Sequence, residues 1–177
     1  MPKIIHNLES RLIEEAKKQI EEVGYSGTTI RSVAKACGVG VGTVYNYFSS
    51  KDELLVSYML EDWKACVAAI GAVSTYSKSP EPVTCCIFDQ LCQFARRHQT
   101  IFRDEGAVAT FAGSFSQYHA MLRDQLAEPL RKFCVDDFTA AFIAESLLTW
   151  TMAGRSFQEI YGVIERLYLP MNMQNKD

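Results

Sequence analysis

The chain has no long hydrophobic run. None of its 177 residues lies in an apolar stretch approaching the roughly 18 residues that a bilayer-spanning helix needs. The N-terminal residues also lack the apolar core of a secretory signal peptide, because acidic residues begin at Glu9. These absences argue against a membrane partner, and we expect a cytoplasmic protein. In that compartment the six cysteines should be reduced.

Motifs that carry catalysis or hold a cofactor are also absent from the sequence. It contains no nucleophile elbow, no glycine-rich phosphate loop and no Cys-x-x-Cys pair that histidines could complete as a metal site. We therefore expect no metal, no cofactor and no enzymatic activity.

Acidic residues are missing from one segment of an otherwise acidic protein. The net charge is −3, yet no Asp or Glu occurs between Gly24 and Lys51, where Arg31 and Lys35 lie. Residues 1–51 carry seven Lys or Arg against five acidic residues, whereas the remainder carries eleven against sixteen. An acid-free segment of this kind favours a surface that faces a polyanion.

Strand patterns are missing as well, because the apolar spacing is helical along the whole chain. Before residue 50 the pattern predicts a first helix that ends at Gly24, since glycine suits a helix C-terminus. A second helix begins at Thr28 or Thr29 and ends near Cys37. A short third helix covers about residues 41–48.

A long fourth helix is predicted to begin at Ser50. In a capping box the Ser50 hydroxyl accepts from the amide of Glu53, whose carboxylate reaches back to the helix start. A linker rich in Ser and Pro follows, and the fold is predicted to be all-α with about nine helices. The later helices are expected at about 82–98, 99–111, 114–127, 137–153 and 156–168. We divide the chain into two domains, at 1–50 and 51–177.

The second and third helices, joined by a turn that contains glycine, form a candidate helix-turn-helix. In this motif the start of the second helix lies against base edges in the major groove. Gly38 permits the tight turn, and Gly40 and Gly42 remove side chains where the helix must approach DNA closely.

Aromatic residues on the third helix strengthen this interpretation. If Val44 and Phe48 are core residues, then Tyr45, Asn46 and Tyr47 are largely exposed. Exposed aromatic side chains on a short helix are unusual without a partner.

Residues 24–55, GYSGTTIRSVAKACGVGVGTVYNYFSSKDELL, resemble the N-terminal DNA-binding domain of TetR-family transcriptional regulators. The resemblance implies a homodimer of all-helical subunits that binds a palindromic operator, typically as a repressor, and that a small ligand releases. The features that match are Thr28-Thr29, Val33-Ala34, Gly38-Val39, Gly42-Thr43-Val44-Tyr45, Tyr47-Phe48 and Lys51-Asp52-Glu53-Leu54-Leu55.

The same resemblance assigns DNA contacts to individual residues. It makes Thr43 and Tyr45 groove contacts, with Asn46 and Arg31 as further candidates, and it makes Thr29, Tyr47 and Lys51 contacts to phosphates or helix ends. Many relatives have polar residues where this chain has Gly40 and Val41. Because Val41 can touch a thymine methyl group but cannot donate a hydrogen bond, we expect thymines opposite it in the operator.

The C-terminal helices are predicted to form the dimer and the effector site. The helices at about 137–153 and 156–168 carry more apolar side chains than one buried face needs, which favours dimerisation through them. Aromatic and polar residues elsewhere in this half could line a cavity for a small, largely apolar or aromatic effector. The candidate ligand-binding residues are Phe88, Cys92, Phe111, Phe115, Tyr118, His119 and Trp150.

Two alternatives remain open at this point. The C-terminal half could bind a protein partner, which would make the chain a DNA-binding adaptor. Cys85 and Cys92 are seven residues apart on one predicted helix face, so the chain could also be a thiol-based redox sensor.

Overall fold

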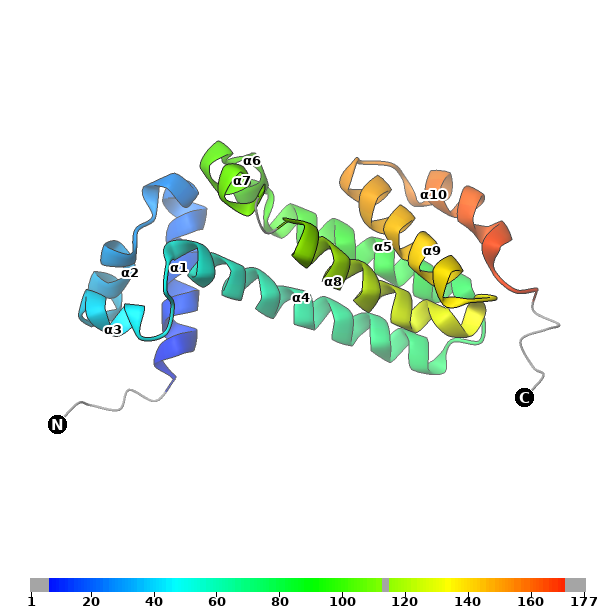
Figure 1. The fold of residues 1–177 in the computed structure, drawn as a ribbon, viewed down its shortest axis with the longest axis horizontal. Helices are drawn as coiled ribbons and strands as arrows, with labels where there is room; N and C mark the ends of the chain where they lie inside the picture. The colour runs from blue at the N-terminus through cyan, green and yellow to red at the C-terminus, as the bar shows by residue number, and fades with distance from the viewer. Residues whose placement is uncertain (1–6, 113–114, 171–177) are drawn as a thin grey trace. The chain divides into compact units, whose positions relative to one another are not determined.

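The computed structural model describes residues 7–112 and 115–170, without the side chains of residues 109–117. In these ranges the chain forms α-helices, two short 3-10 helices and no strand (Figure 1). The all-α prediction is confirmed. The helices are α1 (Leu8–Gly27), α2 (Ile30–Cys37), α3 (Val41–Tyr45), α4 (Lys51–Tyr76), α5 (Pro80–Arg97), α6 (Gln99–Arg103), α7 (Glu105–Ala112), α8 (Phe115–Ala127), η1 (Glu128–Phe133), α9 (Asp137–Met152), α10 (Phe157–Ile164) and η2 (Glu165–Leu167).

Glycines interrupt the first helix, which continues to Gly27 rather than ending at Gly24, and end the second. Gly24 has φ 78°, which interrupts the regular helix inside α1, and Gly38 has φ 70° at the C-terminal end of α2. Residues other than glycine rarely adopt this left-handed conformation. Thr29, rather than Thr28, caps α2: its hydroxyl accepts from the amide of Ser32 at 3.0 Å, and the Ser32 hydroxyl accepts from the Thr29 amide.

The start of α4 confirms one half of the expected capping box. The Glu53 amide donates to the Ser50 hydroxyl at 3.1 Å, as predicted. The Glu53 carboxylate, however, accepts from the backbone amide and the hydroxyl of Ser49, one residue further back than expected. These bonds, the one from the Ser49 hydroxyl first, lower the pKa of Glu53 because they stabilise its charged form.

The chain divides into two compact units. The N-terminal unit comprises residues 1–62 and 98–113, and the C-terminal unit comprises residues 63–97 and 114–177. Helices α6 and α7 therefore belong with the first three helices, and both pack on α1. The functional division at residue 50 stays a prediction, since compactness does not test which residues bind DNA.

One hydrophobic core holds the N-terminal unit together. It contains Leu12, Val33, Val44 and Leu54, all of which are fully buried or nearly so, together with Ile101 of α6. Burying a side chain of this size contributes about 1.5–3 kcal/mol, so this core is what holds α2 and α3 against α1.

The helix expected at 99–111 is two helices, which corrects that prediction. Asp104 lies between them, and its carboxylate accepts from the backbone amides of Gly106 and Ala107 at 3.0 and 3.1 Å. Because those amides open α7, Asp104 caps a new helix instead of continuing α6.

In the C-terminal unit, α5, α8, α9 and α10 pack together with the second half of α4 (Figure 1). The indole of Trp63 is buried, donates to Gln125 at 2.6 Å and meets the Phe94 ring edge-on. The Tyr168 and Thr84 hydroxyls share a buried hydrogen bond of 2.7 Å that ties the end of the described chain to α5. Across the described residues, no helix is both long enough and apolar enough to span a bilayer.

Candidate nucleic-acid interface

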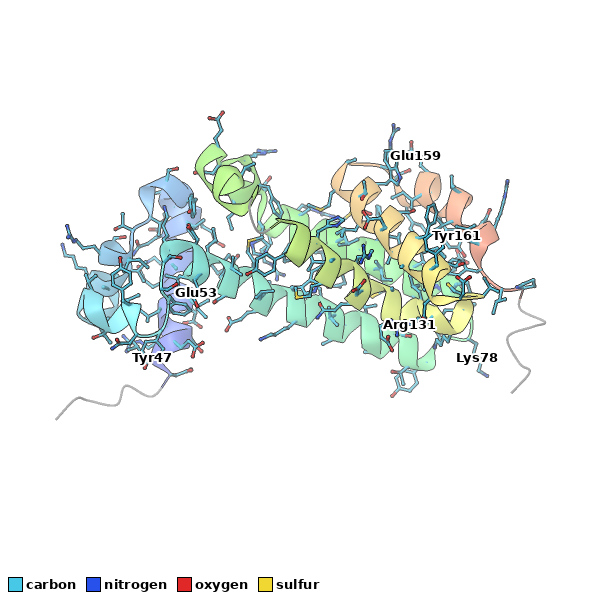
Figure 2. All side chains as sticks on the ribbon, viewed as in Figure 1. Tyr47, Glu53, Lys78, Arg131, Glu159 and Tyr161 are labelled. Atoms are coloured by element: carbon cyan, nitrogen blue, oxygen red, sulfur yellow. The ribbon has the colours of Figure 1, made fainter. Side chains whose placement is uncertain are left out.

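Helix α3 presents one face to the core and the other to the surface. Val44 is 0% exposed and Phe48, just after the helix, is 2% exposed, whereas Tyr45 is 53% and Tyr47 is 44% exposed. The predicted division between core and surface residues is confirmed. Tyr47 lies at the surface beside α3 (Figure 2). The helix thus displays aromatic and hydroxyl groups that its own fold does not need.

The turn between α2 and α3 is short, and backbone hydrogen bonds fix both of its ends. The amides of Gly38 and Val39 donate to the last carbonyls of α2, at 3.2 and 3.0 Å, which closes that helix. The Gly40 carbonyl then accepts from the amides of Thr43 and Val44 and opens α3. These bonds fix the second helix of the pair with few connecting residues, as a helix-turn-helix requires.

The glycines at the start of α3 face open space. A methyl group placed on Gly42 would have no neighbour within 4 Å, and one on Gly40 would have only the Thr43 hydroxyl, at 3.8 Å. A helical glycine costs about 0.5–1 kcal/mol relative to alanine. Because nothing inside the described protein excludes a larger residue, these positions leave room for a partner from outside.

The other predicted DNA contacts surround this helix. Thr29, Arg31 and Asn46 are exposed, and Thr43 is half-buried. Val41 is only partly accessible, because it packs against the core of the unit. Its side chain can therefore present only part of its surface to a base.

Lys51 has a structural role that the sequence interpretation missed. Its ammonium group donates to the Tyr25 carbonyl at 2.8 Å and lies over the Tyr25 ring, while the Tyr25 hydroxyl bonds to Asp52. Together these contacts join the end of α1 to the start of α4. An ammonium group has three protons, so the bond to Tyr25 leaves others that can meet a phosphate.

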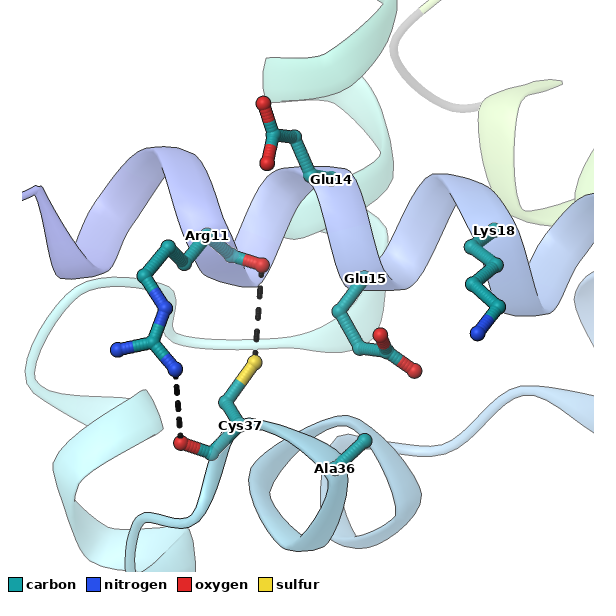
Figure 3. Close-up of a pocket in the computed structure, with 6 residues that line it drawn as sticks. All are labelled: Arg11, Glu14, Glu15, Lys18, Ala36 and Cys37. Atoms are coloured by element: carbon teal, nitrogen blue, oxygen red, sulfur yellow. Dashed lines mark hydrogen bonds between the residues drawn. The ribbon is translucent and has the colours of Figure 1, made fainter.

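A small hollow of about 300 Å³ lies on the same unit, between α1 and α2 (Figure 3). The Arg11 guanidinium donates to the Cys37 carbonyl, and the Cys37 thiol lies 3.6 Å from the Arg11 carbonyl. Burial, followed by the nearby Glu15 carboxylate, raises the pKa of Cys37, which keeps it a thiol. The residues that line the hollow are Arg11, Glu14, Glu15, Lys18, Ala36 and Cys37, and none of them is a predicted effector contact.

The predicted effector contacts fall in the C-terminal unit, except Phe111, which falls in the N-terminal unit. Phe88 packs against Phe157 with ring centres 5.6 Å apart, and Cys92 and Tyr118 are half-buried. His119 lies 3.5 Å from the Glu145 carboxylate. Trp150 is half exposed on α9. The side chains of Phe111 and Phe115, also predicted contacts, lie outside those that the structure describes.

Comparison with known proteins identifies the N-terminal unit. The model of a family described as bacterial regulatory proteins, tetR family, matches residues 12–58, from the first turns of α1 to the second turn of α4. Over this stretch the chain is similar to TetR-family regulators. The matched residues contain both helices of the helix-turn-helix and the turn between them. They are similar to the helix-turn-helix of HTH-type transcriptional regulators.

Individual relatives match longer stretches than the family model does. The HTH-type transcriptional regulator YhgD of Bacillus subtilis is 31% identical over 107 residues, which are 57% of this chain and 54% of YhgD. The HTH-type regulator BetI of Burkholderia thailandensis is 42% identical over 69 residues, 37% of this chain and 35% of BetI. The chain thus matches about half the length of the first relative and less of the second.

Solved structures of transcriptional regulators share the fold over most of the chain. A transcriptional regulator of Streptomyces coelicolor A3(2) superposes with a TM-score of 0.69 at 15% identity, covering 91% of this chain and 98% of that one. FadR of Thermus thermophilus, a TetR-family repressor in complex with lauroyl-CoA, gives a TM-score of 0.63 at 19% identity, covering 96% and 95%. At such identities the likeness concerns the fold alone.

Proposed function

We propose that this chain is a homodimeric, ligand-responsive repressor of the TetR family that binds a palindromic operator through α3. The observation that carries the proposal is the opposite burial of neighbouring residues on α3, with Val44 and Phe48 in the core and Tyr45 and Tyr47 at the surface. The residues that we propose to contact DNA are Thr29, Arg31, Val41, Thr43, Tyr45, Asn46, Tyr47 and Lys51.

The chemistry of these side chains suits duplex DNA. Hydroxyl and amide groups on Thr43, Tyr45 and Asn46 can bond to base edges in the major groove, and the exposed part of Val41 can touch a thymine methyl group. Arg31 and Lys51 supply positive charge for phosphates, and the segment that contains α2 and α3 has no carboxylate to repel them.

A dimer is needed because one unit offers few cations. Two copies roughly double the number of neutralised phosphates, and hence the salt-dependent part of the affinity. Helix α9 carries an exposed stripe at Phe138, Phe142 and Trp150, spaced by multiples of four residues, and Phe138 is 76% exposed. Val163 and Leu167 extend the exposed apolar surface beyond α9. This surface supports dimerisation through α9 and α10, which bury it against a second copy.

The effector is proposed to bind the C-terminal unit and to act on the DNA-binding unit through α4, which runs from one unit into the other. A shift of α4 would alter the separation of the two copies of α3, which must meet half-sites about one helical turn apart. Coupling of about 1–3 kcal/mol is typical for such an effect. Thermus FadR, which shares this fold, binds lauroyl-CoA, so acyl-CoA esters are reasonable first probes for a largely apolar effector.

Burial weakens the redox alternative. It raises the pKa of the thiols of Cys85, Cys86 and Cys92, and the Asp89 carboxylate adds to the shift at all three, although Arg96 opposes it at Cys92. A raised pKa lowers the fraction of reactive thiolate. The ligand-gated regulator therefore remains the function that we propose, acting in the cytoplasm where its DNA target is found.

The test is selection of bound sequences from random duplex DNA. The wild-type protein should enrich a palindrome with thymines opposite Val41, and Tyr45→Ala should weaken binding to it. Tyr76→Ala is the matched control, since Tyr76 is also exposed but lies at the end of α4 in the C-terminal unit. Enrichment of no sequence, or equal losses in the two variants, would contradict the proposal.

A further inference from the structure

Residues 98–113 belong to the N-terminal unit, which is the DNA-binding unit of the proposed function. Their neighbours in the chain, α5 and α8, belong to the C-terminal unit. The chain therefore passes between the two units three times, after Asp62, Arg97 and Gly113. Only the first passage is the continuous helix α4. The second and third passages can restrain the position of the DNA-binding unit only while α6 and α7 stay packed on the rest of that unit.

Asp104 makes that attachment at the end of α1. One carboxylate oxygen, Oδ2, accepts from the Ser26 backbone amide at 3.2 Å. The other, Oδ1, accepts from the Ser26 hydroxyl at 3.1 Å and from the amides of Gly106 and Ala107. One side chain thus caps α7 and joins it to the segment that leads into the helix-turn-helix.

The space around this carboxylate is tight on the α7 side. A methyl group on Gly106 would lie 3.1 Å from both Asp104 Oδ1 and the Ser26 hydroxyl. Ala107, whose amide Asp104 accepts, is fully buried against the core of the unit. The bonds between Asp104 and Ser26 are themselves exposed, but the helix that they hold packs on the core through Ala107. Together these bonds and this packing form a joint between α7 and α1.

A second joint lies at the other end of the segment. His98 is fully buried, with its Nε2 3.1 Å from the Asp62 carboxylate of α4 and its ring 4.8 Å from the Tyr58 ring. His98 and Asp62 are also the residues at which the chain leaves or enters the unit. The two joints hold both ends of the α6 segment to helices of the DNA-binding unit.

We propose that Asp104 is a positioning residue for operator binding, with the His98–Asp62 pair as the second fixed point. This inference rests on the proposed function. While Asp104 holds Ser26, all three passages of the chain restrain the DNA-binding unit. When that bond is weakened, α7 is held to α1 by its buried contacts alone, so the unit is less restrained, and each dimer must order two less restrained units on one operator. Such an ordering cost lowers affinity for paired half-sites and leaves binding to a single half-site unchanged.

Asp104→Asn separates this role from that of a helix cap. The asparagine carbonyl oxygen can keep the bonds of Oδ1 that start α7. Its amide nitrogen replaces Oδ2 and cannot accept from the Ser26 amide, so that bond to α1 is lost, while the carbonyl oxygen can still accept from the Ser26 hydroxyl. Ser26→Ala weakens the joint from the other side without touching the cap of α7.

Asp136→Asn is the matched control. Asp136 caps α9 in the C-terminal unit by accepting from the Thr139 amide at 2.7 Å, so the chemical change is the same as at Asp104. Hydrogen bonds lower the pKa of both aspartates, from the amide of Ala107 at Asp104 and from Thr139 at Asp136. Only Asp104 touches the DNA-binding unit.

The experiment compares the affinity of the full-length protein for the selected operator with its affinity for a duplex that carries one half-site. We expect Asp104→Asn to weaken operator binding about tenfold, an equilibrium change of about 1.4 kcal/mol, with half-site binding unchanged. Ser26→Ala should act in the same direction to a smaller extent, and Asp136→Asn should change neither affinity.

Two results would overturn the inference. Equal affinities for Asp104→Asn and Asp136→Asn would show that the joint does not position the DNA-binding unit. Equal losses on both duplexes would show damage to the helix-turn-helix itself. If the wild-type protein selects no sequence at all, the proposed function fails first and this inference fails with it.

Discussion

The ammonium group of Lys51 lies 3.7 Å from the centre of the Tyr25 ring and donates to the Tyr25 carbonyl. These two contacts connect the start of α4 to the end of α1. The residue that we propose as a phosphate contact therefore also stabilises the unit that presents α3.

Lys51→Met should consequently change both stability and DNA binding. Loss of the cation–π contact and of the hydrogen bond should lower the free energy of unfolding by about 1–2 kcal/mol. Arg31→Met is the control, because Arg31 is exposed on α2 and should cost less than about 0.5 kcal/mol. Both variants should reduce the slope of log affinity against log salt by about one. Urea unfolding and salt titrations with operator DNA measure these effects, and an unchanged stability for Lys51→Met would contradict the role of the Tyr25 contacts.

Gly42→Ala should stabilise the protein while it weakens operator binding. The methyl group has open space in the structure, and alanine is favoured over glycine in a helix by about 0.5–1 kcal/mol. On DNA the same methyl group would occupy the space that we propose the duplex fills. Gly71→Ala, at an exposed and equally open position in α4, should stabilise without changing DNA affinity. Thermal unfolding and operator titrations decide the matter, and equal DNA affinities for the two variants would be evidence against close approach at Gly42.

Phe142→Asp should convert the dimer to monomers. Phe142 is 50% exposed on α9, so a charge there has little effect on the fold of one chain but would be buried without a partner in the proposed interface. Sedimentation velocity should show the smaller species, and operator affinity should fall with it. Tyr76→Asp, a charge at another exposed aromatic position, should leave the dimer intact. A dimeric Phe142→Asp protein would place the interface elsewhere.

Acid should weaken the fold through its helix caps. Hydrogen bonds lower the pKa of Glu53 at the start of α4 and of Glu159 at the start of α10. A carboxyl group whose pKa is lower in the folded than in the unfolded state stabilises the fold at pH values above the unfolded pKa, which is about 4.3 for Glu. This stabilisation is lost as the pH falls through the folded pKa. In Glu53→Gln and Glu159→Gln the melting temperature should therefore fall less steeply than in the wild type as the pH is lowered from about 5 to about 3. An unchanged slope in both variants would argue against these caps as its source.

Much of the local structure was predictable from the sequence, because it depends on residues close together in the chain. Gly38 ends α2 since glycine accepts a left-handed backbone, and Thr29 caps α2 through a residue only three positions away. The spacing of Val44 and Phe48 likewise placed Tyr45 and Tyr47 at the surface. These features carry the resemblance to TetR regulators, which is why the family was recognisable before the fold.

The tertiary structure alone decided which distant groups meet. No local pattern shows that Asp104 bonds to Ser26, or that Lys51 lies over Tyr25, because those pairs are 78 and 26 residues apart in the chain. The split of the helix expected at 99–111 is local, because Asp104 caps the amides of Gly106 and Ala107, but only the tertiary structure placed α6 and α7 with the N-terminal unit. Helix periodicity and caps are short-range properties of the sequence, whereas the joints between helices depend on how the buried core brings them together.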